Sequence, residues 1–97
     1  MTLQFLPEAS AEFGVAVQYY EQQQTGLGRR FRSEILEVCS LITQHPLMWR
    51  ERPGGYRRVN CPVFPYYIAY FIRGDRILVA AVAHGHRLPG YWKARKG

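Results

Sequence analysis

The sequence predicts an α+β fold, in which an antiparallel pair of helices packs on one face of a mainly antiparallel four-stranded sheet. Apolar residues recur at helical spacing through residues 7–44, whereas β-branched and aromatic residues dominate residues 56–84. The period changes after Pro53-Gly54-Gly55, a turn-forming stretch. The 97 residues suffice for one modest core, so residues 1–97 are expected to form a single domain.

The first part of the chain is expected to contain a short strand and two helices. Residues 3–6 form the strand and lead into Pro7, which suits the first helical turn because its missing N–H is not needed there. The first helix covers residues 7–23, and Gly26-Leu27-Gly28 ends its pattern. The second helix covers residues 27–44. The short break between the helices predicts an antiparallel pair.

The second part is expected to contain three strands. Residues 56–61 alternate weakly between apolar and polar types, and residues 66–72 are strongly β-prone. Residues 77–84 form an apolar run that ends near His84, and Gly74 supplies the positive φ of a tight turn before it. The expected order is therefore β-α-α-β-β-β, followed by a short C-terminal segment.

Composition narrows the classes of function. No apolar stretch approaches the roughly 20 residues of a membrane span. The N-terminus lacks the features of a signal peptide, so we expect a cytoplasmic protein without a membrane partner. Cys39 and Cys61 are expected to be reduced and to pack as small apolar residues. Because the chain has no Cys-x-x-Cys and no helical His pair, we expect no zinc or other metal site. We also expect no cofactor and no small-molecule substrate.

Charge is unevenly distributed along the chain. Residues 1–48 carry three Arg and five Glu, a net charge of −2, whereas residues 49–97 carry eight Arg and two Lys against Glu51 and Asp75, a net charge of +8. Arginine forms bidentate forks with phosphate or carboxylate, so we favour an anionic partner for the second half. The alternative is a solvated basic surface.

Two histidines and an arginine follow the last expected strand. His84, His86 and Arg87, together with Arg57, could supply the acid, base and cations of metal-free RNA cleavage. In the alternative that we favour, His84 is a hydrogen-bonded residue at a strand end and His86 is a solvated loop residue.

Arg57 and Arg58 are adjacent on an expected strand, so their side chains should point to opposite faces of the sheet. One of them could project from the open face as a clamp for phosphate or carboxylate. Alternatively, one is solvated and the other forms a peripheral ion pair, with Glu34 or Glu37 as the candidate partner. The sequence leaves both interpretations open.

Tyr91 and Trp92 follow the turn at Pro89-Gly90. They could stack on bases, or they could fold back to cap the core. We favour the cap for Trp92, because an aromatic side chain of that size is usually mostly buried. Residues 49–52 are expected to form a loop between the helices and the sheet.

Several segments resemble the ParE/RelE toxin superfamily, in its ParE or "plasmid stabilisation" branch. Residues 19–31 resemble the helix-hairpin signature of that branch, residues 64–70 resemble its Phe-Pro-Tyr strand, and Arg57 stands where it usually carries an arginine. Its C-terminal signature is matched by His84, Arg87, Pro89, Tyr91, Trp92 and Arg95. The resemblance spans almost the whole chain, with the same element order.

This resemblance implies the toxin of a type II toxin–antitoxin pair, held inactive by a ParD-like or RelB-like antitoxin encoded beside it. ParE-like members poison DNA gyrase, whereas RelE-like members enter the ribosome and cleave mRNA without metal. The chain lacks the Lys-rich central strands of the RelE-like group, since its lysines are Lys93 and Lys96. We therefore expect a toxin that binds gyrase without catalysis. The alternatives are a ribosome-dependent endoribonuclease and a non-toxic, basic nucleic-acid-binding remnant.

The functional surface is expected where the end of the last strand and the C-terminal segment meet Arg57 or Arg58. The candidate residues for binding a target or a phosphate are Arg57, Arg58, Arg87, Tyr91 and Arg95. His84, His86 and Arg87 are the catalytic candidates if the chain is an RNase. The antitoxin is expected to wrap the helical hairpin and the sheet with an acidic, amphipathic tail.

Overall fold

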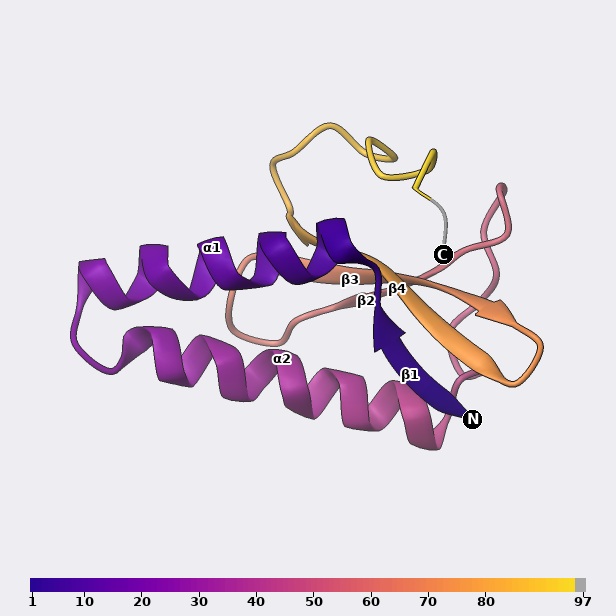
Figure 1. Cartoon of the computed structure of the whole chain (residues 1–97), viewed down its shortest axis with the longest axis horizontal. Helices are drawn as coiled ribbons and strands as arrows, with labels where there is room; N and C mark the ends of the chain where they lie inside the picture. Colours follow the sequence, from indigo (N-terminus) through magenta and orange to yellow (C-terminus); the bar gives the residue numbers. More distant parts are fainter. Residues whose placement is uncertain (96–97) are drawn as a thin grey trace.

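The computed structural model describes residues 1–95 and confirms the expected fold class and element order (Figure 1). Its elements are β1 (Thr2–Phe5), α1 (Pro7–Gln23), α2 (Leu27–Gln44), β2 (Arg57–Asn60), β3 (Tyr66–Arg73) and β4 (Arg76–His84). The expected strand bounds were wrong by one residue in places. The first strand ends at Phe5, for example, because Leu6 already serves as the N-cap residue of α1.

The sheet has the strand order β1-β4-β3-β2. β3 pairs antiparallel with β4 and with β2, whereas β1 pairs parallel with β4. β1 covers only the first half of β4, since the last paired residues are Phe5 and Val79. Within residues 1–95, no strand lies on this side of β4 beyond Val79, so residues 80–84 form what we call the free edge of β4.

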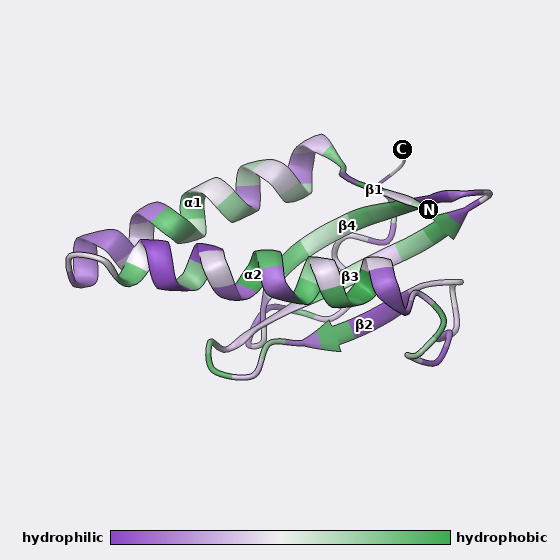
Figure 2. Cartoon of the chain, turned by 90° about the horizontal axis from the view of Figure 1, so that it is seen from below, coloured by the Kyte–Doolittle hydropathy of each residue, from purple (hydrophilic) through white to green (hydrophobic). Residues whose placement is uncertain are grey.

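The two helices lie antiparallel on one face of the sheet (Figure 1). In Figure 2, β4 is green or pale along most of its length, whereas α2 alternates between green and purple. The apolar stripe expected on the second helix consists of Leu27, Phe31, Ile35, Val38 and Ile42, and all of these are buried except Leu27, which is half-buried. It packs on the sheet residues Val59, Ile68, Tyr70, Ile77, Val79 and Val82. This helix-side core confirms the amphipathic pattern of the second helix.

The turn between the helices depends on a very close approach of α1 and α2. The carboxylate of Glu21 accepts hydrogen bonds from the backbone N–H groups of Gly26 and Gly28, at 2.9 and 3.1 Å. These N–H groups belong to the start of α2, where a negative charge is favourable. A Cβ on Gly28 would lie 2.6 Å from the carbonyl oxygen of Val17, so only glycine fits there.

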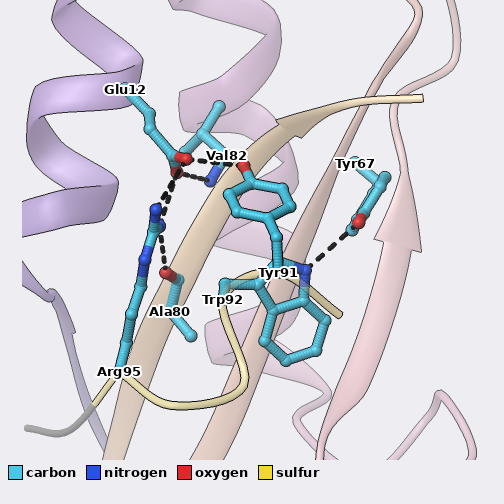
Figure 3. Close-up of polar contacts among 7 residues, drawn as sticks. All are labelled: Glu12, Tyr67, Ala80, Val82, Tyr91, Trp92 and Arg95. Atoms are coloured by element: carbon cyan, nitrogen blue, oxygen red, sulfur yellow. Dashed lines mark hydrogen bonds and ion pairs between the residues drawn. The ribbon is translucent and has the colours of Figure 1, made fainter. Parts of the chain in front are cut away.

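The C-terminal segment covers the opposite face of the sheet. Ala69, Ala80, Ala81 and Ala83 present only methyl groups on this face, which leaves room for a large ring. The indole of Trp92 fills that room with 1% of its surface exposed. Its Nε1 donates a hydrogen bond to the hydroxyl oxygen of Tyr67 at 3.1 Å (Figure 3). The expectation that Trp92 caps the core is therefore confirmed.

Both cysteines are free thiols, as expected. Cys39 is buried in the helix-side core and Cys61 is partly buried against it. Burial raises the pKa of each thiol from its usual value of 9.0 to about 12. Both side chains are therefore neutral at physiological pH and behave as small apolar residues.

Candidate functional site

Along the free edge of β4, side chains rather than a neighbouring strand form hydrogen bonds with the backbone. The backbone N–H of Val82 donates a hydrogen bond to Glu12 Oε1 at 3.2 Å. The carbonyl oxygen of Ala80 accepts one from Arg95 Nη1 at 3.0 Å. Glu12 comes from α1 and Arg95 from the C-terminal segment, and the two side chains meet beside β4 (Figure 3). The segment is thereby fixed to both the sheet and the helices.

Glu12 is the centre of this cluster. Its two carboxylate oxygens accept parallel hydrogen bonds from Arg95, at 2.9 and 3.0 Å, and Oε2 also accepts the hydroxyl of Tyr91 at 2.5 Å. Burial raises the pKa of the Tyr91 phenol, and the bond to Glu12 raises it further. The hydrogen bonds that Arg95 itself donates to Glu12 raise the pKa of Arg95. Tyr91 is therefore a neutral donor and Arg95 a permanent cation, and we call these three residues the Glu12 cluster.

A groove of about 790 Å³ lies beside the cluster, between α1 and the end of β4. Its helix wall includes Val15 and Tyr19, which are 71% and 55% exposed. Tyr20 and Tyr66 also line it, and burial raises the pKa of both phenols, so both are neutral at physiological pH. The groove thus offers mainly uncharged aromatic and aliphatic surface.

His84 and Arg87 line the same groove. The ring centroid of His84 lies 5.2 Å from that of Tyr66 and 4.9 Å from that of His86. Its Nδ1 accepts a hydrogen bond from the backbone N–H of His86 at 3.0 Å, while the side chain of His86 is exposed. This geometry agrees with the interpretation of His84 as a hydrogen-bonded strand end and His86 as a loop residue.

The guanidinium of Arg87 lies on the ring of Tyr91, 3.9 Å from its centroid. Tyr91 is itself held by Glu12, so the ring is a fixed support for the cation. The ion pairs found among residues 1–95 join Arg57 to Glu51 and Arg95 to Glu12. Arg87 therefore has no carboxylate partner within the described chain.

Arg57 and Arg58 point to opposite faces of β2, as expected. Arg57 shares the helix-side face with Val59 and donates to the carbonyl oxygen of Trp49 at 2.6 Å. It also pairs with Glu51 at 3.4 Å. One of the two alternatives thus has its ion pair, but the candidate partners Glu34 and Glu37 were wrong, because the loop before β2 brings Glu51 closer.

The carboxylate of Glu34 has a different role. It accepts hydrogen bonds from the backbone N–H groups of Val63 and Phe64, at 3.1 and 2.9 Å, and so holds the loop before β3. Arg58 lies on the other face of the sheet, over the ring of Tyr67 at 3.8 Å, and its Nε donates to Asn60 at 3.0 Å. Arg58 is thus linked to the C-terminal segment through Tyr67, the partner of Trp92.

The structure therefore places the expected site residues in separate parts of the molecule. His84, Arg87 and Tyr91 line one groove, with Arg95 beside them in the Glu12 cluster. Arg57 lies elsewhere, because it is in register with Tyr70 of β3, whereas His84 is in register with Tyr66. Four positions along a strand correspond to roughly 13 Å. The expected meeting of Arg57 with the histidines does not form.

Glu12 was missed from the sequence, although a signal for it exists. It stands three residues after Ala9 and four before Ala16, and both alanines are buried toward the sheet. This spacing places Glu12 on the buried side of α1. A carboxylate in that position requires partners from elsewhere in the fold.

Two kinds of feature do not occur within residues 1–95. No group of three or more His, Cys, Asp or Glu side chains is placed to hold a metal ion. No helix in this part of the chain is long and apolar enough to cross a membrane.

Comparison with known proteins identifies the family. A family model described as "ParE toxin of type II toxin-antitoxin system, parDE" matches residues 3–89. The chain belongs to the ParE toxin family. It is thus a toxin of the type II toxin–antitoxin class, as the resemblance implied. Within this ParE toxin, Glu12, His84 and Arg87 fall inside the matched residues, whereas Tyr91 and Arg95 follow them.

A solved structure shares the fold. It is described as "Chromosomal ParDE TA system from P. aeruginosa", and it aligns with a TM-score of 0.74 over 87% of this chain and 95% of that chain. Sequence identity is 18%, so the likeness concerns the fold alone. A search of curated protein sequences finds no significant match.

Proposed function

We propose that this ParE-family chain inhibits growth in the cytoplasm by binding DNA gyrase, and that an antitoxin encoded beside it neutralises it. The separation of Arg57 from the histidines is the main observation in favour of binding over catalysis. Metal-free RNA cleavage needs cations around the phosphate as well as an acid and a base. Arg87 is the arginine beside His84 in the groove, and Arg57 is engaged by Glu51 and Trp49.

The test compares gyrase and cellular mRNA as targets. The chain is expressed from an inducible promoter, growth is followed, and the purified protein is added to gyrase in a supercoiling assay. We expect growth arrest and loss of supercoiling, with cellular mRNA intact by primer extension. Cleaved mRNA together with unaffected gyrase would contradict the proposal.

The second candidate is a ribosome-dependent endoribonuclease. The proximity of His84 and His86, with Arg87 in the same segment, favours it. In that case His84→Ala and His86→Ala should each lower mRNA cleavage by roughly 10²–10⁴-fold, because proton transfer is lost. If the chain instead binds gyrase, the same substitutions should affect toxicity only where they alter the contact surface.

A parent chain that does not arrest growth would instead favour the third alternative, a non-toxic, basic nucleic-acid-binding remnant.

Charge supports an acidic antitoxin. Residues 49–97 carry a net charge of +8, and complementary charge speeds association and makes it sensitive to salt. Titration calorimetry with the purified neighbouring protein should show binding that weakens as salt rises. If that protein does not bind even at low ionic strength, the antitoxin part of the proposal fails.

A further inference from the structure

The face of the sheet opposite the helices carries four basic side chains around its aromatic core. Three of them lie over rings of that core, with the charged group between 3.8 and 5.6 Å from the ring centroid. These pairs are Arg58 with Tyr67, Arg73 with Phe71, and Lys93 with Tyr56. The fourth is Arg76, which lies directly opposite Arg73 in the register of β3 and β4, so both side chains leave the same face. We call Arg58, Arg73, Arg76 and Lys93 the basic face.

Among residues 1–95, no carboxylate forms an ion pair with the basic face. The ion pairs in this part of the chain involve Arg57 and Arg95 instead. Five of the seven carboxylates belong to the helices on the other side of the sheet, namely Glu8, Glu12, Glu21, Glu34 and Glu37. Glu51 pairs with Arg57, which leaves Asp75 in the turn between β3 and β4. Four cations against one carboxylate make this face strongly positive.

The two arginines at the hairpin are unfavourable for the fold alone. Like charges directly opposite each other on neighbouring strands repel and destabilise a sheet. Arg73 and Arg76 are both exposed, so neither compensates by packing in the core. Residues that break a rule of local stability without a compensating contact are expected at functional sites. The pair therefore indicates a ligand whose negative charge is shared between the two guanidinium groups.

The surface around these cations favours the phosphates of a double helix over other anions. Trp92, Tyr67 and Phe71 are only 1%, 2% and 7% exposed, so they offer no surface on which unpaired bases could stack. The exposed large apolar residues lie in the helices, in loops or at Met1, and none lies in a strand of this face. An amphipathic protein segment would need such residues as anchors. Cations on rigid supports are instead what contact with a phosphate backbone requires.

We infer that the basic face binds duplex DNA through its phosphates, without reading the base sequence. Arg58 is in register with Ala69, four positions before Arg73, so the face extends over roughly 13 Å along β3. Duplex DNA carries one charge per about 1.7 Å of its axis, so several phosphates fall within that length. The inference goes beyond the proposed function, which requires contact with gyrase alone. A toxin with this face contacts the DNA that gyrase holds as well as the enzyme.

DNA binding is measured by the fluorescence anisotropy of a short labelled duplex, at salt concentrations from about 50 to 200 mM. Four phosphate contacts should give a slope of about −3 to −4 when log affinity is plotted against log salt concentration. Duplexes of different sequence should bind equally, because phosphates carry no base information. A single strand of the same sequence should bind more weakly, since the buried rings cannot stack on its bases.

Variants locate the site on the basic face. Arg73→Ala together with Arg76→Ala should weaken binding at least about tenfold at low salt and reduce the size of the slope by about 2. Arg58→Ala should reduce it by about 1. Arg32→Ala is the matched control, since it removes an exposed arginine from α2, and it should bind like the parent. In urea denaturation the hairpin double variant should be at least as stable as the parent, because a repulsive pair is removed.

Three results would overturn the inference. The first is a parent chain that does not bind the duplex at low salt, and the second is an Arg32→Ala variant that loses as much affinity as the hairpin double variant. The third is tighter binding of the single strand than of the duplex. The supercoiling assay judges the proposed function separately. A chain that binds DNA through the basic face but leaves gyrase active contradicts the proposed function and leaves this inference standing.

Discussion

Glu12 brings one carboxylate into contact with three donor residues, one in β4 and two in the C-terminal segment. It is a half-buried charge whose bonds to Val82, Tyr91 and Arg95 compensate for the loss of hydration. Glu12 and Arg95 each keep 17% of their side-chain surface exposed. Substitution of Glu12 should be costly, because removal of its charge leaves Arg95 without its ion-pair partner.

Replacing Glu12 by Gln should therefore lower the free energy of unfolding by about 2–3 kcal/mol, somewhat less than for a fully buried pair. Glu51→Gln is the matched control, since its pair with Arg57 is largely exposed on the glutamate side and should contribute about 0–1 kcal/mol. Urea denaturation followed by circular dichroism measures both. Equal midpoints for the two variants would show that the Glu12 cluster contributes little to stability.

Arg87 is the residue on which toxicity is expected to depend. Arg87→Ala removes a fixed fork of donors, and Arg87→Lys restores the charge without the fork. We expect the Ala variant to relieve growth arrest on induction and the Lys variant to relieve it in part. Arg87 carries no ion pair within residues 1–95, so circular dichroism should show both variants folded. A folded Ala variant as toxic as the parent would exclude this residue from the target surface.

At the scale of the elements, the helical hairpin is the most constrained connection. Gly28 allows the start of α2 to lie against α1, where Glu21 accepts two backbone N–H groups. Gly14 offers a natural comparison, because nothing lies within 4 Å of a Cβ added there. One helical glycine thus serves packing, and the other does not.

We expect Gly28→Ala to destabilise the fold by about 1–3 kcal/mol through overpacking. Gly14→Ala should stabilise it by roughly 0.5–1 kcal/mol, because alanine restricts the unfolded chain and favours a helix. Thermal denaturation of the two variants and the parent measures the opposite signs. A stabilising Gly28→Ala would mean that the helices can move apart without cost.

The elements were predictable because their signals are local. The period of α1 and α2, the β-prone residues of β3 and the glycine of the last hairpin all act over a few residues. The bonds of the candidate site are not local: Glu12 and Arg95 are 83 positions apart. Which donor reaches Glu12 depends on the path of the C-terminal segment, and that path is set by the burial of Trp92.

The partner of Arg57 was missed for a related reason. The sequence offered several acidic residues, and the choice among them depends on the loop before β2. Arg57 binds the carbonyl oxygen of Trp49 in that loop, and this contact brings Glu51 within 3.4 Å. Loop conformation is determined by such packing rather than by periodicity.

At the scale of the whole molecule, the buried thiols and phenols make the stability of the fold vary with pH in the alkaline range. Cys39 and Cys61 ionise near 9.0 when unfolded and near 12 when folded. The folded state therefore holds protons that the unfolded state releases, so its stability falls as the pH rises from 9 toward 12. Burial raises the pKa of Tyr20, Tyr66 and Tyr91, which act in the same direction.

Urea midpoints measured from pH 8 to pH 11 should therefore decrease steadily. In a chain with Cys39→Ala and Cys61→Ala together, the decrease should be smaller but still present, since the tyrosines remain. An equal decrease in both proteins would assign the pH dependence to the tyrosines alone. A midpoint that rises with pH would contradict the burial of these groups.

The placement of β4 between β1 and β3 has a consequence for folding during translation. Ribosomes make chains from the N-terminus, so the strand that joins the two sides of the sheet is the last one synthesised. β1 can pair only after residues 76–79 have been made, and Glu12 can bind its partner only after Arg95 has been made. We therefore expect a nascent chain to remain without its complete sheet until residues 76–95 have been synthesised. The toxin fold would then be complete only after these residues have left the ribosome, and the time before that is available for an antitoxin already present to reach the chain.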